Sequence, residues 1–224
     1  MAQLILVRHG QASFGRANYD KLSDLGHDQA MALGQTLLAR GISPDVWACG
    51  TMVRQAETLR GIQRGLGFAA QDPIVHAGLN EYDFTGLLNA RFANEAPPEG
   101  IYTDRKVHFQ NLRSTVAAWQ DDDITDPPET WATFAQRTVQ ACRDLMEVKD
   151  AKTILAVSSG GAISQIVSTI LETSKRQQIE LQLQIKNASL TTVVFSATKG
   201  VRFVSTFNET PFVTDKTEHL LSYS

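Results

Sequence analysis

Residues 4–10 read Leu4-Ile5-Leu6-Val7-Arg8-His9-Gly10, four apolar residues that run directly into an arginine, a histidine and a glycine. The apolar run predicts a buried strand, and Gly10 marks the turn after it. In open α/β sheets, ligands bind beyond the carboxyl ends of the strands. Arg8 and His9 therefore stand where a phosphate site can form, and we interpret them as residues of a reaction site rather than of the core.

Short apolar runs recur along the chain with helical segments between them, which is typical of an α/β protein. The expected strands cover residues 4–7, 45–49, 153–157, 191–196 and 201–208, and the expected helices cover residues 24–40, 51–66, 129–145 and 162–172. We expect Thr51 to cap the second helix. The last two strands are too close for a parallel crossover, so they should form an antiparallel hairpin. This pattern predicts a three-layer α/β sandwich with a mostly parallel sheet and an antiparallel edge.

The chain is long enough for one domain, and we expect a single domain over residues 1–224. Residues 84–130 are the least regular part, with an expected helix around residues 106–119, and we interpret them as a helical and loop insertion over the site. The tail, residues 211–224, is mainly polar. We expect it to be disordered or to pack against a partner.

Composition excludes some classes of protein. The formal net charge of −3 argues against a general nucleic-acid binder. Cys49 and Cys142 lack the spacing of a metal site, and reduced thiols are the simplest interpretation. The expected strand begins by Gln3, so we expect no signal peptide, and no apolar run reaches membrane-spanning length. We therefore expect a cytoplasmic protein that does not bind membranes.

Phosphoryl transfer through histidine needs a neutral imidazole, cationic groups on the phosphate oxygens and an acid for the leaving oxygen. His9 is the candidate nucleophile, and Arg8 beside it can bind phosphate. Arg54 lies in the first turn of the second expected helix, at the same sheet edge. Glu81 is the candidate acid, and Asp83 and Glu57 are its alternatives.

Polar residues after the first strand could line the pocket, although any exposed loop contains such residues. They are Gln11, Ser13 and Asn18. The acidic residues Asp121 to Asp123, with Asp126 and Glu129, read as a solvated loop, because no pattern fixes their geometry for a metal. We expect neither a metal nor a cofactor.

The chain resembles the histidine phosphatase superfamily, which includes the cofactor-dependent phosphoglycerate mutases, over most of its length. The strand with Arg8-His9-Gly10 matches the opening motif of that family, and residues 22–30 match its Leu-Ser-x-x-Gly-x-x-Gln-Ala segment. Residues 50–58 correspond to the Arg-Ala-x-Glu/Gln-Thr motif, with one residue inserted or shifted after the arginine. Leu79-Asn80-Glu81 with Phe84 and Gly86 corresponds to the acid motif, and residues 134–137 resemble the helix before the last catalytic strand.

The resemblance implies that His9 becomes a phosphohistidine, that Arg8 and Arg54 bind phosphate, and that Glu81 protonates the leaving group and then activates water. One motif departs from the family. The family has Val-Ser-His-Gly-Gly where this chain has Val157-Ser158-Ser159-Gly160-Gly161, so Ser159 replaces a second histidine. A serine hydroxyl donates one hydrogen bond without charge, and the loss of one preorganised donor costs roughly 10²–10³ in rate. Ser159 and the Gly160 amide can still bind an anion at a helix N-terminus.

Three functions follow for this chain. The first is a phosphomonoester hydrolase without a metal, weakened by Ser159, that acts on a phosphorylated small molecule or a phosphopeptide. The second is a catalytically silent phosphate-binding or regulatory protein. A mutase is the third, disfavoured because Gln11-Ala12 and residues 18–21 differ from the motifs of the mutases. A homodimer through an edge strand or the tail is also open.

Overall fold

A computed structural model describes residues 1–13, 20–101, 103–196 and 200–223. Its first strand, β1 (Ala2–Arg8), lies in the middle of the sheet. Leu4 and Leu6 of β1 face one apolar cluster, and Ile5 and Val7 face another. Both faces of the strand are covered, which explains why its sequence is continuously apolar instead of alternating.

The described residues form one six-stranded sheet in the order β3-β2-β4-β1-β5-β6. The strands after β1 are β2 (Val46–Cys49), β3 (Ile74–Val75), β4 (Thr153–Ser158), β5 (Leu190–Ser196) and β6 (Val201–Glu209). The first four strands of that order are parallel, whereas β5 runs antiparallel to β1 and β6 antiparallel to β5. The predicted fold class and hairpin are confirmed. The sequence did not predict β3, whose two residues are too few to carry a pattern.

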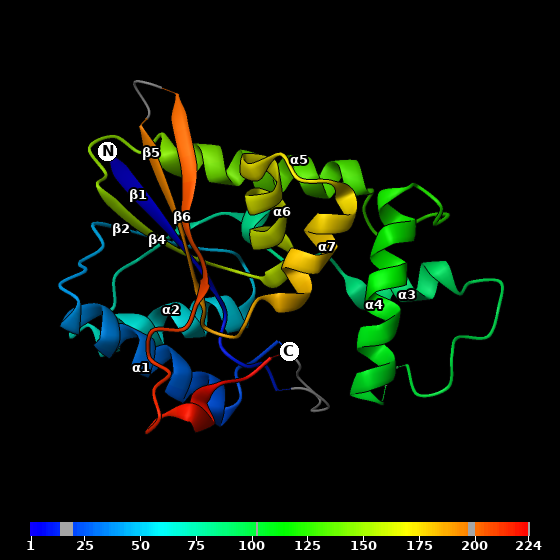
Figure 1. Cartoon of the computed structure of the whole chain (residues 1–224), viewed down its shortest axis with the longest axis horizontal. Coiled ribbons are helices and arrows are strands. Elements are labelled where there is room, and N and C mark those ends of the chain that lie inside the picture. Colours follow the sequence, from blue (N-terminus) through cyan, green and yellow to red (C-terminus); the bar gives the residue numbers. More distant parts are fainter. Residues whose placement is uncertain (14–19, 102, 197–199, 224) are drawn as a thin grey trace.

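Helices cover both faces of the sheet and make three layers (Figure 1). On one face, α1 (Asp24–Ala39) and α2 (Val53–Gly65) pack on the cluster that contains Ile5 and Val7. On the other face, α5 (Trp131–Met146) and α6 (Gly160–Leu171) pack on the cluster that contains Leu4 and Leu6. The four helices predicted from sequence are therefore present, with small differences at their ends.

Thr51 does not cap α2, contrary to our expectation. Met52 is the N-cap residue. The Thr51 hydroxyl instead accepts a hydrogen bond from Asn80 Nδ2 at 2.7 Å, and the Thr51 amide donates to Asn80 Oδ1 at 2.8 Å. These bonds fasten the start of α2 to the loop that precedes Glu81.

Residues 84–130 hold α3 (Phe84–Arg91) and α4 (Arg105–Gln120), at the right of Figure 1, and α4 packs on α7 (Lys175–Gln184). A third apolar cluster joins this segment to the sandwich; its buried members are Tyr82, Leu87, Leu112, Val116, Trp119, Ile124, Phe134, Ala162 and Ile179. The predicted helix at residues 106–119 is present. The sequence analysis did not predict α3 or α7. In α7, Ile179, Leu181 and Leu183 alternate with polar residues as they would in a strand.

The expectation of a disordered tail is wrong, and packing of the tail against a partner stays a prediction. Phe212 and Leu220 are buried in the cluster under α1. Gln29 of α1 donates hydrogen bonds from Nε2 to the Leu220 carbonyl and to Ser222 Oγ, both at 2.8 Å. The tail is therefore held on the chain's own first helix.

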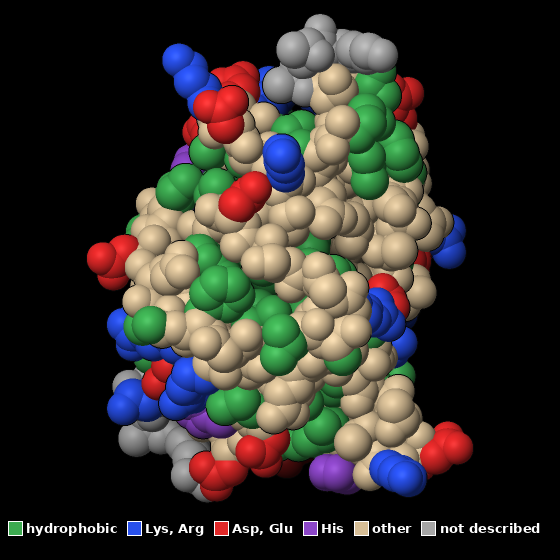
Figure 2. Space-filling model, turned by 90° about the vertical axis from the view of Figure 1, so that its left-hand side faces the viewer, with side chains coloured by type: hydrophobic (Ala, Val, Ile, Leu, Met, Phe, Trp, Pro, Cys, Tyr) green, Lys and Arg blue, Asp and Glu red, His purple; other side chains and the backbone are tan. Residues whose placement is uncertain are grey.

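The face in Figure 2 carries Lys, Arg, Asp and Glu side chains mixed together, with hydrophobic side chains in separate small groups between them. Among the residues drawn in colour, that face has no continuous basic surface. Within the described part of the chain, no helix combines the length and apolar character needed to span a bilayer.

Candidate active site

The ends of β1 and β4 bring two turns of the chain together. The two strands are parallel neighbours, with Arg8 opposite Ser158 in register. The His9 amide continues the pairing by donating to the Ser158 carbonyl at 3.0 Å. His9 and Ser159 therefore lie next to each other at the carboxyl edge of the sheet, where sequence placed the site.

His9 is buried, with 6% of its surface exposed. Its Nδ1 lies 2.8 Å from the Gly10 carbonyl oxygen, which can only accept, so Nδ1 carries the proton. Arg54 Nε donates to the other ring nitrogen, Nε2, at 3.1 Å. Burial lowers the pKa of His9 well below its ordinary value, and the positive charges of Arg54 and Arg8 lower it further. His9 is therefore a neutral imidazole whose lone pair is on Nε2.

Both predicted arginines are buried beside His9. Arg8 donates from Nη1 to the Ile185 carbonyl. Arg54 donates from Nη1 to Asp20 Oδ1 at 2.7 Å, and Asp20 Oδ2 accepts from the Val53 amide at 2.9 Å. Asp20 thus ties the Arg54 guanidinium to the N-terminus of its own helix. Sequence reasoning did not identify Asp20 as a site residue, because no local pattern distinguishes it from a loop aspartate.

Residues 22–30, which match a family segment, pack closely against the turn that follows His9. A Cβ atom on Gly26 would lie 2.3 Å from the Gln11 carbonyl oxygen, and a Cβ on Gly10 would lie 2.5 Å from the Gly26 carbonyl oxygen. Two glycines thus let α1 pack directly on the turn after His9. The Gly10 amide also donates to Thr58 Oγ1 of α2 at 3.0 Å. The turn is therefore fixed by both helices of that layer.

Glu81, the candidate acid, also lies at this edge. Its Oε2 accepts a hydrogen bond from the Gly161 amide of α6 at 2.9 Å, and its Oε1 accepts from the Tyr82 amide at 3.3 Å. Burial raises its pKa, while the Gly161 amide and the arginines, Arg54 before Arg8, act in the opposite direction. A raised pKa keeps the proton that a general acid must donate.

The two alternatives to Glu81 have structural partners. Asp83 is exposed and caps α3, where its Oδ1 accepts from the Gly86 amide at 2.9 Å. Glu57 accepts from the Leu22 amide at 2.8 Å and so holds the chain at the start of α1.

Arg137 of α5 positions the loop that carries Glu81. Its guanidinium forms a two-pronged ion pair with Glu129, at 2.6 and 2.9 Å, and donates to the Asn80 carbonyl at 2.9 Å and the Gly78 carbonyl at 3.3 Å. The sequence predicted that Glu129 belongs to a solvated acidic loop. The structure instead pairs Glu129 with Arg137. Arg137 was noted only as part of a family-like helix, and its role follows from the fold.

The other predicted substrate-binding residues have different outcomes. Ser159 is fully buried at the start of α6 and accepts a hydrogen bond from Gln55 Nε2 at 3.0 Å. Gly160 lies beside Arg8, since a Cβ atom there would be 3.6 Å from Arg8 Nε. Gln11 accepts from the Ser23 hydroxyl at 2.9 Å, which engages its side chain with α1. Asn18 lies outside the described residues.

The shift proposed for the second arginine motif is not needed. α2 runs without interruption from Val53 to Gly65, and Arg54, Glu57 and Thr58 all make the contacts described above. The residue that departs from the motif is Gln55, which stands in the position of its alanine.

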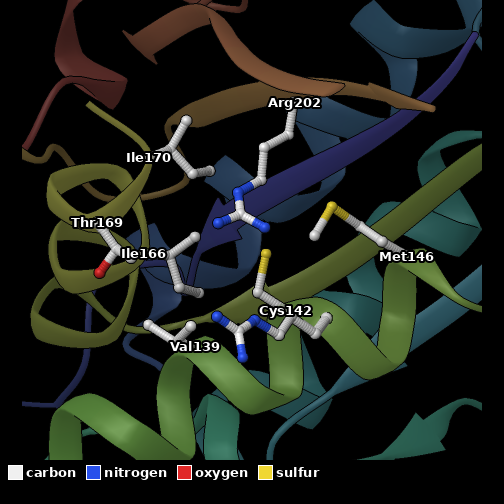
Figure 3. A pocket seen from close by; sticks show the side chains of 8 residues that line it. Val139, Cys142, Met146, Ile166, Thr169, Ile170 and Arg202 are labelled. Atoms are coloured by element: carbon white, nitrogen blue, oxygen red, sulfur yellow. The ribbon is translucent and has the colours of Figure 1, made fainter. Parts of the chain in front are cut away.

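Other features do not add to this site. A shallow hollow between α5, α6 and β6 (Figure 3) is lined by Val139, Cys142, Arg143, Met146, Ile166, Thr169, Ile170 and Arg202, and it includes none of the residues around His9. Both cysteines are buried and unpaired with one another. Over the described ranges, no cluster of His, Cys, Asp or Glu has the arrangement of a metal site.

The family model of the histidine phosphatase superfamily (branch 1) matches residues 4–209. Among curated proteins, a 2,3-bisphosphoglycerate-dependent phosphoglycerate mutase of Chelativorans sp. (strain BNC1) is 24% identical over 187 residues, which are 80% of this chain and 86% of the relative. A protein of the same name from Parvibaculum lavamentivorans is 26% identical over 192 residues, with 80% and 85% covered.

Two solved structures of phosphatases share this fold. A phosphoserine phosphatase from Entamoeba histolytica, in complex with phosphoserine, matches with a TM-score of 0.66 and 19% identity, over 96% of this chain and all of the other. A mycobacterial glucosyl-3-phosphoglycerate phosphatase, in complex with inorganic phosphate, matches with a TM-score of 0.67 and 20% identity, with the same coverage. At these identities the likeness establishes the fold and leaves the substrate open.

Proposed function

Since the chain belongs to the histidine phosphatase superfamily, we propose that it is a phosphomonoester hydrolase that acts through a phosphohistidine intermediate at His9. The observation that carries the proposal is the state of the His9 ring. Nδ1 is bound to the Gly10 carbonyl and Nε2 faces Arg54, so the nucleophilic nitrogen is turned toward the cation that would bind phosphate.

In the first step, the phosphate of the substrate binds between Arg8, Arg54 and His9, and takes over the Arg54 donor that Nε2 holds in the free protein. The Nε2 lone pair then forms a bond to phosphorus while the ester P–O bond breaks. Glu81 gives its proton to the leaving oxygen, which departs as an alcohol. The raised pKa of Glu81 supports this role, because the carboxyl must enter the step protonated.

In the second step, the Glu81 carboxylate takes a proton from water, and the water oxygen bonds to phosphorus as the N–P bond breaks. Inorganic phosphate leaves, and His9 and Glu81 return to their starting states. No metal ion enters either step. Arg8 and Arg54 supply the positive charge, and Ser159 supplies one neutral hydrogen-bond donor.

The proposed substrate is a phosphorylated small molecule, with a phosphopeptide as the alternative. The names of the two solved relatives support the small molecule, because both act on small phosphorylated compounds. The segment with α3 and α4 follows the Glu81 loop along the chain, and its proposed role is to contact the remainder of the substrate. Two buried thiols fit a cytoplasmic location.

A catalytically silent phosphate-binding protein is the second candidate. One observation favours it: the position next to His9 holds the neutral side chain of Ser159, already engaged by Gln55. A mutase is less favoured. Although the curated relatives carry that name, Gln11 stands in the motif position where the mutases have glutamate, and its side chain is engaged by Ser23.

Hydrolysis of an aryl phosphate in the presence of a chelator tests the proposal. We expect turnover by the native chain and none by His9→Ala. Protection of the native chain against unfolding by inorganic phosphate, without turnover and without a phosphorylated His9, would instead support the silent protein.

A further inference from the structure

Gln55 is a fully buried glutamine in the third position of α2, directly after Arg54. A buried amide loses stability unless its polar atoms have partners. Both hydrogens of Gln55 Nε2 are used, one to the Leu79 carbonyl at 2.9 Å and one to Ser159 Oγ at 3.0 Å. Its Oε1 accepts from the Met52 amide at 3.4 Å. The side chain therefore joins the start of α2, the Glu81 loop and the start of α6.

Gly50 leaves room for the buried side chain of Gln55. A Cβ atom on Gly50 would lie 2.0 Å from Gln55 Oε1 and 2.3 Å from Asn80 Oδ1. Any side chain at position 50 would displace the Gln55 amide or the Asn80 side chain. The absence of a side chain at Gly50 thus allows the Gln55 amide to stay on Ser159.

These contacts restrict the direction of the Ser159 hydroxyl. The amide nitrogen of Gln55 offers hydrogens only, so the Ser159 oxygen accepts and its own proton points elsewhere. The Leu79 carbonyl is not available to that proton, because it already accepts from Gln55 Nε2 and from Ser158 Oγ, the latter at 2.7 Å. Among the described residues, the Ser159 hydroxyl donates no hydrogen bond to another group of the chain.

We propose that Gln55 is a positioning residue that holds the Ser159 hydroxyl with its proton directed at the phosphoryl group bound on His9. The proposal rests on the proposed phosphatase reaction for its catalytic consequence. Ser159 lies beside His9 in the register of β1 and β4, so a phosphoryl oxygen is the acceptor that the geometry leaves open. Gln55 thereby gives a neutral serine a fixed donor direction, which an oxyanion site needs.

A double-mutant cycle tests the proposal with Gln55→Met, Ser159→Ala and the combined variant. Methionine keeps the length of glutamine and removes its hydrogen bonds. Gln63→Met is the matched control, because Gln63 is also a buried glutamine of α2 but bonds to Gln71, away from the site. Each protein is assayed for kcat and KM with an aryl phosphate and for binding of inorganic vanadate, and its thermal unfolding is recorded.

We expect Ser159→Ala to lower kcat about 10²-fold and Gln55→Met to lower it about tenfold, each with a small change in KM. In the Ser159→Ala background, Gln55→Met should then change kcat less than about twofold, since its route of action is gone. Vanadate affinity should show the same coupling. Equal losses from Gln55→Met in both backgrounds, or an equal loss from Gln63→Met, would overturn the proposal.

Two further results separate this proposal from the proposed function. If the native chain shows no turnover, the phosphatase proposal fails, and the vanadate cycle alone decides the role of Gln55. If Gln55→Met does not fold, Gln55→Glu replaces it. A carboxylate of the same size accepts the Ser159 proton and so turns the donor away from the phosphate, and unchanged kcat and vanadate affinity in Gln55→Glu would overturn the proposal.

Discussion

Glu81→Gln removes the carboxyl proton that the leaving oxygen needs, while glutamine keeps the size of the side chain. Glu81 accepts from the Gly161 amide at 2.9 Å, and an amide oxygen can keep that bond. The change therefore isolates proton transfer from packing. General acid catalysis contributes about 10²–10⁴ in rate. This range corresponds to about 3–5 kcal/mol in the barrier at ~1.4 kcal/mol for each factor of ten.

The loss should depend on the leaving group. An alkyl phosphate releases a strongly basic alkoxide unless the oxygen is protonated, so its kcat/KM should fall by about 10³ or more in Glu81→Gln. p-Nitrophenyl phosphate releases a stable phenolate, and its kcat/KM should fall far less. The two substrates give the same phosphoenzyme, so kcat/KM, measured by steady-state hydrolysis, compares the first step alone.

Asp83→Asn is the matched control, because it neutralises a carboxylate two residues further along the chain. Asp83 is exposed and caps α3, and asparagine is an equally good cap. Its kcat/KM should stay within about twofold of the native value for both substrates. Equal losses for both substrates in Glu81→Gln, or a leaving-group dependence in Asp83→Asn, would refute the assignment of Glu81 as the acid.

Three further results are expected. Gly161→Ala should abolish activity, because the new Cβ would lie 2.2 Å from Glu81 Oε1. Gly160→Ala should keep its activity, because the atom nearest to the new Cβ, Arg8 Nε, is 3.6 Å away. Equal kcat/KM in the two variants would contradict this packing. Arg137→Met should lower the free energy of unfolding by about 1–3 kcal/mol in urea titrations and lower kcat, since it unpairs the carbonyls of the acid loop; a loss of neither would contradict its positioning role. Since the pKa of His9 lies well below 6.5, kcat/KM should show no His9 limb as pH falls through 6.5. The free energy of unfolding should decrease there because the unfolded chain takes up the proton first. An NMR titration of the His9 ring, assigned by comparison with His9→Ala, that has its midpoint at pH 6.5 would contradict this.

The sheet and the edge that carries the candidate site could be predicted because their signals are local. A continuous apolar run before Arg8 and His9 predicts a buried strand, and parallel neighbours place the ends of such strands together. Arg54 and Glu81 were proposed because Arg54 lies in the first turn of a predicted helix and Glu81 in the loop after an apolar stretch, and both positions also match family motifs. The structure places all four residues at one edge.

The residues that sequence missed act over long separations. Gln55 bonds to Ser159, and Arg137 bonds to the Asn80 carbonyl, through contacts that exist only after folding. Asp20 reaches Arg54 in the same way. A buried glutamine in a helix carries no signal of its burial in the sequence, because its type is common on surfaces. Such partners follow from packing, not from spacing.

The errors over helices and the tail have a different cause. The sequence of α7 has apolar residues at alternate positions, and tertiary contact with α6 and α4 favours a helix there. The tail has few apolar residues, but Phe212 and Leu220 both fill the core beneath α1. Two well-placed side chains and the bonds to Gln29 are enough to order it.

The covalent intermediate is the most direct test of the account. The native chain, mixed with substrate and quenched with alkali within one turnover, should carry a phosphate on His9 in mass spectra of its peptides, and the label should be lost in acid as a phosphoramidate is. His9→Ala should carry none. Turnover by the native chain without phosphate on His9, or with phosphate on another residue, would contradict the account.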